Sequence, residues 1–213
     1  MEARDLLHEL AQAELPSFAA ELPLTRKAIS FAALLHQGQR RASDEAPFIL
    51  HPLEVALALS TADYPDRVVA AGVLHDVIED TDAVIEEIRR DFGDPIADLV
   101  SSLTEDATIV DPVARKEALR AQVKAAGPEA ATVFAADKLS KVRELRVRLA
   151  NLSRLAEPLP LEMEHQLGHY IASLGMLEEV IPGEPIVRQL RFELEALHIL
   201  PPGELSRTPG PSA

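Results

Sequence analysis

Apolar residues recur three and four positions apart along almost the whole chain, the spacing that places them on one face of a helix. In the segment 24–37, for example, Ala28, Phe31, Ala32 and Leu35 fall on one stripe. No segment shows a convincing strand-like alternation of apolar and polar residues. Read together with the proline and glycine positions, the pattern predicts helices over residues 2–15, 24–37, 51–62, 66–79, 84–92, 94–104, 112–126, 127–149, 162–177 and 186–200.

The predicted helices follow one another without a linker or an internal repeat, so we expect a single all-α domain over residues 1–200. Its motifs fall in a core at 24–150, and further helices occupy 160–200. The Pro- and Gly-rich end, 201–213, is expected to be disordered. Aromatic residues make up only 4% of the chain, so the core is predicted to consist mainly of Leu, Ala, Val and Ile, with Ala130, Val133, Phe134 and Leu139 among its residues.

Composition excludes several classes of function. The net charge of −14 argues against broad nucleic-acid binding, which needs clustered Lys and Arg, although a local basic pocket could still hold an anion. The chain has no cysteine, hence no disulfide and no thiolate ligand. It has no apolar run of membrane-spanning length and no signal peptide, so we expect no membrane partner and a cytoplasmic location.

The most informative feature is the pair His75 and Asp76, which follows the apolar run VVAAGVL. A buried carboxylate is costly unless it is paired, and a metal ion is a natural partner for a His and an Asp together. Glu79 and Asp80 lie four residues further on, so a continuous helix would place all four groups at one end of one surface. The alternative is a solvated cluster of acids at the start of a helix.

Two further residues complete a possible metal site. His51 stands before Pro52 at the start of a predicted helix, and Asp137 interrupts an otherwise apolar helix face. Each has a simpler explanation, as a helix-capping histidine or as a surface acid that pairs with Lys141 one turn on. Together, two histidines and two carboxylates would leave coordination positions open for water and a substrate oxygen, as a catalytic metal requires.

The remaining histidines are weaker candidates. We expect His36 to be structural or to support the site rather than to bind metal. His165 and His169 share a helix face at a spacing that could bind metal, but no third ligand is evident. A solvated surface pair is therefore the better interpretation of these two residues.

Four segments in order, HQGQRRASDEAPFILHPLEVA, AAGVLHDVIEDT, EEIRRDFGDPIADLVSSLTED and AADKLSKVREL, are similar to the HD-domain metal phosphohydrolases. More narrowly, they resemble the hydrolase domain of RelA/SpoT-type alarmone hydrolases, and in size the small stand-alone members. The resemblance covers roughly residues 24–150. It implies an all-α HD-domain helical bundle that binds one Mn²⁺ and a small nucleotide substrate, and that cleaves the 3′-pyrophosphate from guanosine tetra- or pentaphosphate.

The resemblance also implies roles for individual residues. The metal ligands fall on His51, His75, Asp76 and Asp137, and the catalytic acids on Glu79 and Asp80, without distinguishing which acid is the base. The residues that would contact the substrate are Arg41, Lys138, Lys141 and Glu144.

The chain departs from the family on the helix of Asp137. The family's usual Asp-Arg-Leu-His-Asn-Met-Arg-Thr-Leu reads here Asp-Lys-Leu-Ser-Lys-Val-Arg-Glu-Leu, so Lys141 and Glu144 replace Asn and Thr. Lys141 would offer a point charge to a phosphate, or it would pair with Glu144 and leave function unchanged. Two other functions stay open: an HD phosphatase for a different nucleotide, and a non-catalytic module that binds a nucleotide or a partner protein. Nothing in the sequence fixes the oligomeric state.

Overall fold

The computed structural model describes residues 16–155 and 160–199, and within these ranges the chain is helical apart from turns and one isolated β-bridge between Arg40 and Pro47. The predicted helix at 2–15 and the predicted disorder of 201–213 lie outside the described residues. The elements are η1 (Ser17–Ala19), α2 (Pro23–Leu35), α3 (Leu50–Thr61), α4 (Asp66–Leu74), α5 (Val77–Asp80), α6 (Ile85–Phe92), α7 (Asp94–Leu103), α8 (Pro112–Ala126), α9 (Pro128–Leu155), α10 (Leu161–Val180) and α11 (Pro185–Ile199).

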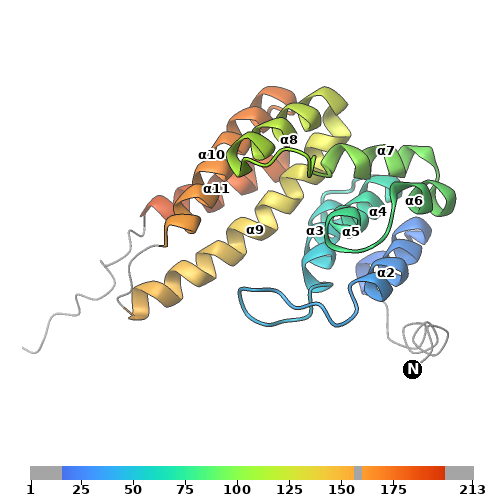
Figure 1. Cartoon of the computed structure of the whole chain (residues 1–213), viewed down its shortest axis with the longest axis horizontal. Coiled ribbons are helices and arrows are strands. Elements are labelled where there is room, and N and C mark those ends of the chain that lie inside the picture. The colour runs from blue at the N-terminus through green and yellow to red at the C-terminus, as the bar shows by residue number, and fades with distance from the viewer. Residues whose placement is uncertain (1–15, 156–159, 200–213) are drawn as a thin grey trace, which may run out of the picture.

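Helix α9 joins the two sides of the bundle. It runs obliquely through the molecule, with α2 to α7 on one side and α8, α10 and α11 on the other (Figure 1). It packs against α3, α4 and α7 as well as α8, α10 and α11. The four core residues predicted for this helix, Ala130, Val133, Phe134 and Leu139, are all buried, so that expectation is confirmed. Because α9 carries Asp137 through this interior, an acid is held where elements from both halves meet.

Helix α4 is buried on every side from Val68 to Leu74, which explains why its sequence is a continuous apolar run rather than a stripe. It packs against α2 and α3. At Gly72 a β-carbon would lie 2.6 Å from Leu59 Cδ1, closer than real contacts allow. The glycine therefore lets α4 approach α3 closely, and this close approach positions the end of α4 beside the residues of α3.

The single helix predicted over 66–79 is wrong, because the chain turns at His75 and Asp76 between α4 and α5. The Nδ1–H of His75 donates to Gly72 O at 2.7 Å, a carbonyl that a continuous helix would use for the N–H of Asp76. The side chain thus competes with the helical hydrogen bonds at the point where the helix stops. The turn changes the direction of the chain, so spacing along one helix does not decide where Glu79 and Asp80 lie relative to His75.

Thr81 does not cap the start of α6. Its Oγ1 donates to Val77 O at 2.7 Å and accepts from Ala83 N–H at 3.1 Å, so it closes α5 instead. At α6 the N–H of Val84 donates to the carboxylate of Glu87. The predicted helix at 127–149 also extends further, to Leu155, while the helix predicted to end at 37 stops at Leu35.

The carboxylate of Asp66, at the start of α4, satisfies the free N-terminal amides of α2. It accepts from the N–H groups of Leu24 and Thr25, both at 2.9 Å, and from Thr25 Oγ1 at 2.7 Å. We expect Asp66→Ala to lower the free energy of unfolding by about 1–3 kcal/mol, because α2 then loses its cap and buried donors lose their acceptor. Urea denaturation measures the change, and Asp66→Asn, which keeps one acceptor oxygen, should lose less. Equal stability of Asp66→Ala and the parent protein would contradict this role.

None of the described helices is long and apolar enough to cross a membrane.

Candidate metal and phosphate site

Three parts of the chain bring the four predicted ligands together. His51 comes from the first turn of α3, His75 and Asp76 from the turn after α4, and Asp137 from the middle of α9. All four residues are buried. His51 Nε2 lies 3.2 Å from His75 Nε2, 3.3 Å from Asp76 Oδ2 and 3.2 Å from Asp137 Oδ1. His75 Nε2 lies 3.1 Å from Asp76 Oδ1 and 3.5 Å from Asp137 Oδ1.

The second ring nitrogens of the two histidines fix how the rings are protonated. Ser140 Oγ donates its one hydrogen to Glu54 Oε2 at 2.7 Å, so it must accept from His51 Nδ1, which lies 3.1 Å away. His75 Nδ1 donates to the carbonyl of Gly72. Each neutral ring therefore presents a lone pair on Nε2, and the two lone pairs face each other across 3.2 Å. Such an arrangement requires a positive charge between them, either a proton or a metal ion.

The donor atoms of His51, His75 and Asp137 all lie within 4.8 Å of one another, which fits a small divalent cation, and Asp76 contacts both histidines but is not part of that group. Ligand atoms bound about 2.0–2.2 Å from such an ion lie roughly 3.0–3.5 Å from one another, the range of the separations given above. Asp137 Oδ1 is buried and accepts no hydrogen bond although it lies beside both histidines. Burial opposes a charged imidazole, yet Asp76 and Asp137 outweigh it and raise the pKa of His75 to about 10. The cluster thus attracts positive charge, and its residues could hold a divalent metal.

Glu79 reaches the same place from α5. It lines a cavity of about 30 Å³ together with His75, Asp76 and Asp137, a volume sufficient for a water molecule. Glu79 Oε1 accepts from the N–H of Glu105 at 2.5 Å, and Glu105 is itself held by Arg115 and Lys116. Burial raises the pKa of Glu79, and the nearby carboxylate of Asp76 adds to this effect. A carboxylate with a raised pKa is better matched to accept a proton near neutral pH.

Asp80 does not line this cavity. Asp80 is an exposed residue, and partial desolvation and the charge of Asp76 raise its pKa. Its main-chain carbonyl accepts from Gln39 Nε2 at 2.7 Å, which ties α5 to the loop after α2. The two acids that sequence spacing treats as equivalent therefore occupy different surroundings.

Lys138 and Lys141 both contact Asp137. Lys138 Nζ donates to Asp137 Oδ2 at 2.6 Å and lies 4.4 Å from the centroid of the Phe134 ring. Lys141 Nζ lies 3.0 Å from Asp137 Oδ1 and 3.9 Å from Asp76 Oδ1. Lys141 is therefore paired with the predicted ligands, and the structure gives no ion pair between it and Glu144 among the described residues. The expected surface pairing of Asp137 with Lys141 does occur, but Asp137 is buried.

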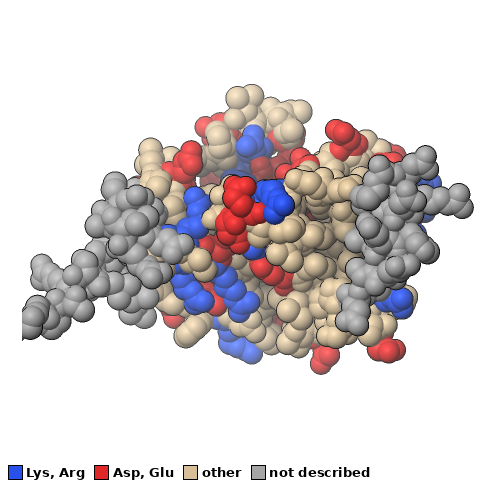
Figure 2. Space-filling view, turned by 90° about the horizontal axis from the view of Figure 1, so that it is seen from below, with Lys and Arg blue, Asp and Glu red and all other residues tan. Residues whose placement is uncertain are grey.

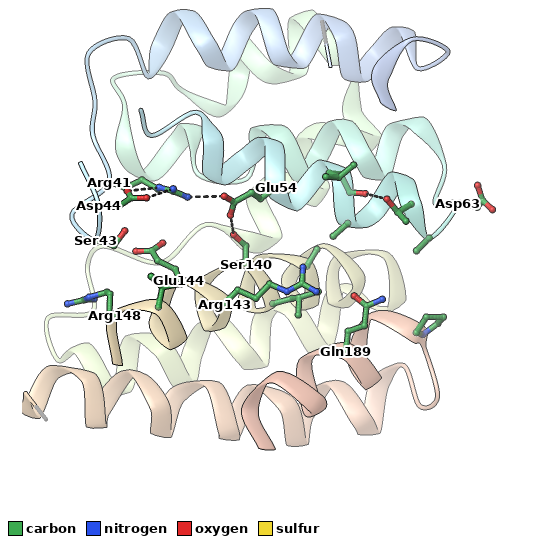
Figure 3. Close-up of a pocket in the computed structure, with 18 residues that line it drawn as sticks. Arg41, Ser43, Asp44, Glu54, Asp63, Ser140, Arg143, Glu144, Arg148 and Gln189 are labelled. Atoms are coloured by element: carbon green, nitrogen blue, oxygen red, sulfur yellow. Dashed lines mark hydrogen bonds and ion pairs between the residues drawn. The ribbon is translucent and has the colours of Figure 1, made fainter. Parts of the chain in front are cut away.

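Arg41 is held in the loop between α2 and α3. Its guanidinium binds both oxygens of Asp44, at 3.1 and 2.6 Å, and Glu54 Oε1 at 2.9 Å. Figure 3 shows the continuation of this chain of contacts from Glu54 to Ser140 on α9. The loop is thereby linked, through Arg41, Glu54 and Ser140, to the ring nitrogen of His51 that faces away from the cluster.

Two cavities share the lining residues Arg41, Glu144 and Arg148, and the smaller is also lined by His51 of the cluster. The larger, about 730 Å³, lies between α3, α9 and the start of α11, and its walls are partly apolar. Figure 3 shows Glu144 of α9 pointing toward Ser43 in the loop before α3. The smaller, about 350 Å³, reaches His51 and Lys141.

The smaller cavity is basic. Four cationic residues line it against the single acid Glu144: Arg40, Arg41, Lys141 and Arg148. Figure 2 shows charged side chains of both signs over the centre and left of the face seen there. Positive charge is thus concentrated beside the cluster, where an anion could bind.

The other histidines lie outside the cluster. His36 Nδ1 lies 2.7 Å from Gln39 Oε1, which agrees with a supporting role. His165 is exposed, but His169 is half-buried, with Nδ1 at 2.7 Å from Arg120 Nη1. Burial and then the charges of Lys138, Lys116 and Arg120 lower the pKa of His169 to about 3. The interpretation of these two as a solvated pair is therefore wrong for His169.

Sequence reasoning missed Glu54, Ser140 and Glu105. Glu54 follows His51 by three residues and Ser140 follows Asp137 by three, so helical spacing could have placed both on the ligand faces. Glu105 is 26 residues from Glu79 and contacts it through a main-chain N–H, for which the sequence carries no signal.

We expect Ser140→Ala to weaken metal binding by about tenfold, because Nδ1 of His51 loses the acceptor that fixes its tautomer. Titration of the metal-free protein with Mn²⁺ measures this. Ser102→Ala, which removes a hydroxyl bonded to a helix carbonyl on α7, is the matched control and should bind metal normally. An unchanged affinity in Ser140→Ala would show that the hydrogen bond does not orient His51.

Comparison with known proteins gives consistent matches. A family model described as an HD domain matches residues 28–157. The guanosine-3′,5′-bis(diphosphate) 3′-pyrophosphohydrolase of Homo sapiens is 39% identical over 122 residues, which are 56% of this chain and 68% of the relative. The protein of that activity from Aquifex aeolicus is 34% identical over 62% of this chain and 19% of its own length. A GTP pyrophosphokinase of Streptomyces coelicolor is 36% identical over 56% of this chain, and the match spans only 14% of that longer protein.

Solved structures agree with the fold. A metazoan ortholog of SpoT, described as hydrolysing ppGpp, superposes with a TM-score of 0.71 over 88% of this chain and 100% of that chain, at 24% identity. A protein of Listeria monocytogenes superposes with a TM-score of 0.60 at 30% identity, over 70% of this chain and 94% of that one. The predicted all-α architecture is confirmed by these likenesses and by the helices described above.

Proposed function

The chain belongs to the HD domain family, and from that premise we propose that it is a Mn²⁺-dependent phosphohydrolase that removes the 3′-pyrophosphate of guanosine tetra- or pentaphosphate. The observation that carries the proposal is the pair of imidazole nitrogens facing each other at 3.2 Å between two buried carboxylates. His51, His75, Asp76 and Asp137 would hold the ion. When bound, the ion supplies positive charge that polarises a phosphoryl oxygen and acidifies a water molecule.

Glu79 is the base in this proposal. Its carboxylate lines the small cavity beside the ligands, and the N–H of Glu105 fixes one of its oxygens. Glu79 accepts the proton of the attacking water, whose oxygen bonds to phosphorus as the bond to the 3′ oxygen of the sugar breaks. Pyrophosphate then leaves, and the 3′ oxygen takes up the proton held by Glu79 and becomes a hydroxyl. Asp80 lies outside this cavity, and we assign it to a substrate hydroxyl rather than to the water.

The charge of the substrate is met by the basic residues around the cluster. Lys138 and Lys141 lie nearest to the ligands, and the guanidinium groups of Arg40 and Arg148 line the cavity that reaches His51. We place the phosphates there and the nucleoside in the larger, partly apolar cavity, whose volume is typical of sites for small ligands. The relatives named for this activity support the choice of a guanosine 3′-pyrophosphate.

A second candidate is a phosphohydrolase of the same chemistry for a different nucleotide. Lys141 and Glu144 favour it, because they change the wall beside the cluster. Glu144 places a carboxylate in both cavities, where it repels phosphate but can accept from amino groups of a base.

The test is product release from a nucleotide panel with Mn²⁺, with an Asp76→Ala protein as control. The panel contains guanosine and adenosine 3′-pyrophosphates, simple nucleoside phosphates and NADPH. Pyrophosphate released from a guanosine 3′-pyrophosphate, and absent in the control, is the expected result. If only another nucleotide of the panel is hydrolysed, the phosphohydrolase activity stands and the substrate is that nucleotide. If no member is hydrolysed while Mn²⁺ still binds, the proposed activity fails, and a binding module becomes the better interpretation.

A further inference from the structure

Both carboxylate oxygens of Asp137 face lysine ammonium groups. Lys138 Nζ donates to Oδ2 at 2.6 Å, and Lys141 Nζ lies 3.0 Å from Oδ1. Oδ1 is also the oxygen that faces His51 and His75, at 3.2 and 3.5 Å. A lysine therefore contacts the atom that a metal ion in this cluster would need, so the two cations compete for one oxygen.

The two lysines are held very differently. Lys138 is 5% exposed, makes a hydrogen bond to Asp137 and lies over the ring of Phe134, so it is fixed in the interior. Lys141 is 34% exposed, and Oδ1 accepts no hydrogen bond despite its proximity. Lys141 is thus held by ion pairs with Asp137 and Asp76 and is partly open to solvent. Its flexible four-carbon stem gives the ammonium freedom to move.

Lys141 also faces an anion site. It lines the cavity of about 350 Å³ with Arg40, Arg41 and Arg148, so an anion bound there would attract the same ammonium. The ammonium group of Lys141 therefore lies between the carboxylate of Asp137 and a basic cavity.

We propose that Lys141 is an exchangeable counter-ion, which neutralises Asp137 in the metal-free protein and moves to a bound phosphate when the metal takes Asp137 Oδ1. This inference rests on the metal site of the proposed function. Its consequence is that metal and anion bind cooperatively. The anion draws Lys141 away and frees the ligand oxygen, and by linkage the metal strengthens anion binding by the same factor.

The experiment is a Mn²⁺ titration of the metal-free protein, with free Mn²⁺ counted by electron paramagnetic resonance. Without a multivalent anion, Lys141→Met should bind Mn²⁺ about tenfold more tightly than the parent protein, the size expected for a residue that touches a ligand. The matched control is Lys116→Met. Lys116 lines the small cavity but pairs with Glu105 rather than with a ligand, so its loss should tighten binding less.

Sulfate at constant ionic strength supplies the second readout. It resembles phosphate in charge and binds Mn²⁺ weakly, and it should tighten Mn²⁺ binding in the parent protein more than in Lys141→Met. The proposal would be overturned if Lys141→Met bound Mn²⁺ no more tightly than the parent protein in the sulfate-free buffer. It would also be overturned if Lys116→Met and Lys141→Met raised the affinity for Mn²⁺ by the same factor. These titrations need no turnover, so a nucleotide panel without product would reject the proposed activity and leave this result standing.

Discussion

Asp76→Ala is expected to lose metal binding and hydrolysis together. The carboxylate lies 3.3 Å from His51 and 3.1 Å from His75, on the turn that joins α4 to α5. Without it the cluster loses one of its two carboxylates, and we expect the remaining donors to hold a divalent ion poorly. We expect affinity for Mn²⁺ to fall roughly a hundredfold or more, since even residues that only orient a ligand contribute about 10- to 100-fold. Calorimetric titration with Mn²⁺ and an assay of product release measure the two losses.

The control for Asp76→Ala removes the same charge elsewhere. Asp98 on α7 is 67% exposed and pairs with Arg89, so Asp98→Ala should bind Mn²⁺ and turn over substrate normally. If Asp76→Ala binds Mn²⁺ like the parent protein but is inactive, Asp76 is not a metal ligand and acts in the reaction itself.

Glu79→Gln should retain Mn²⁺ binding but lose hydrolytic activity. The amide keeps an oxygen for the N–H of Glu105 but cannot accept a proton from water. We therefore expect normal Mn²⁺ binding and a loss in kcat of about 10²- to 10⁴-fold, the usual contribution of a general base. Asp80→Asn is the matched control and should lose less, because Asp80 does not line the small cavity. Hydrolysis by Glu79→Gln at the parent rate would assign the base elsewhere.

Stability provides a check that Glu79→Gln is folded. Burial raises the pKa of Glu79 in the folded, metal-free protein. The folded state therefore favours the protonated acid, and this contribution is complete below the unfolded pKa and is lost as pH rises through the folded pKa. At neutral pH the ionised Glu79 thus destabilises the metal-free protein. Glu79→Gln should unfold at the same or a higher temperature there, so its inactivity would not reflect unfolding.

Local patterns predicted most of the helices because each depends on residues close in sequence. Helices α7, α8 and α11 begin and end within about two residues of their predicted bounds, marked by glycine, proline and apolar spacing. The break between α4 and α5 was missed, because no proline or glycine marks it. The helix breaks where the side chain of His75 donates a hydrogen bond to the carbonyl of Gly72. A helical pattern of apolar residues does not reveal such a bond.

The candidate site was predictable in its residue types but not in its contacts. His75 and Asp76 stood out because ionisable groups follow a buried run. His51 was added from its place before Pro52 and Asp137 from its place on an apolar helix face, and the motif resemblance strengthened both. Which of Glu79 and Asp80 faces the ligands depended on the turn at His75 and on Glu105, which follows α7. The position of Lys141 depended on how α9 crosses the end of α4. From the sequence alone, Lys141 could equally have paired with Glu144.

By itself, the sequence determined the helical class, the buried face of α9 and the set of groups able to hold a metal ion. These follow from spacing and chemical type, which act over a few residues. Tertiary structure alone decided that two imidazole lone pairs meet, that a cavity beside Glu79 can hold water, and that Lys141 contacts Oδ1 of Asp137. Those features depend on atoms from α3, α5 and α9 meeting within a few ångströms, and the packing of distant segments sets such distances.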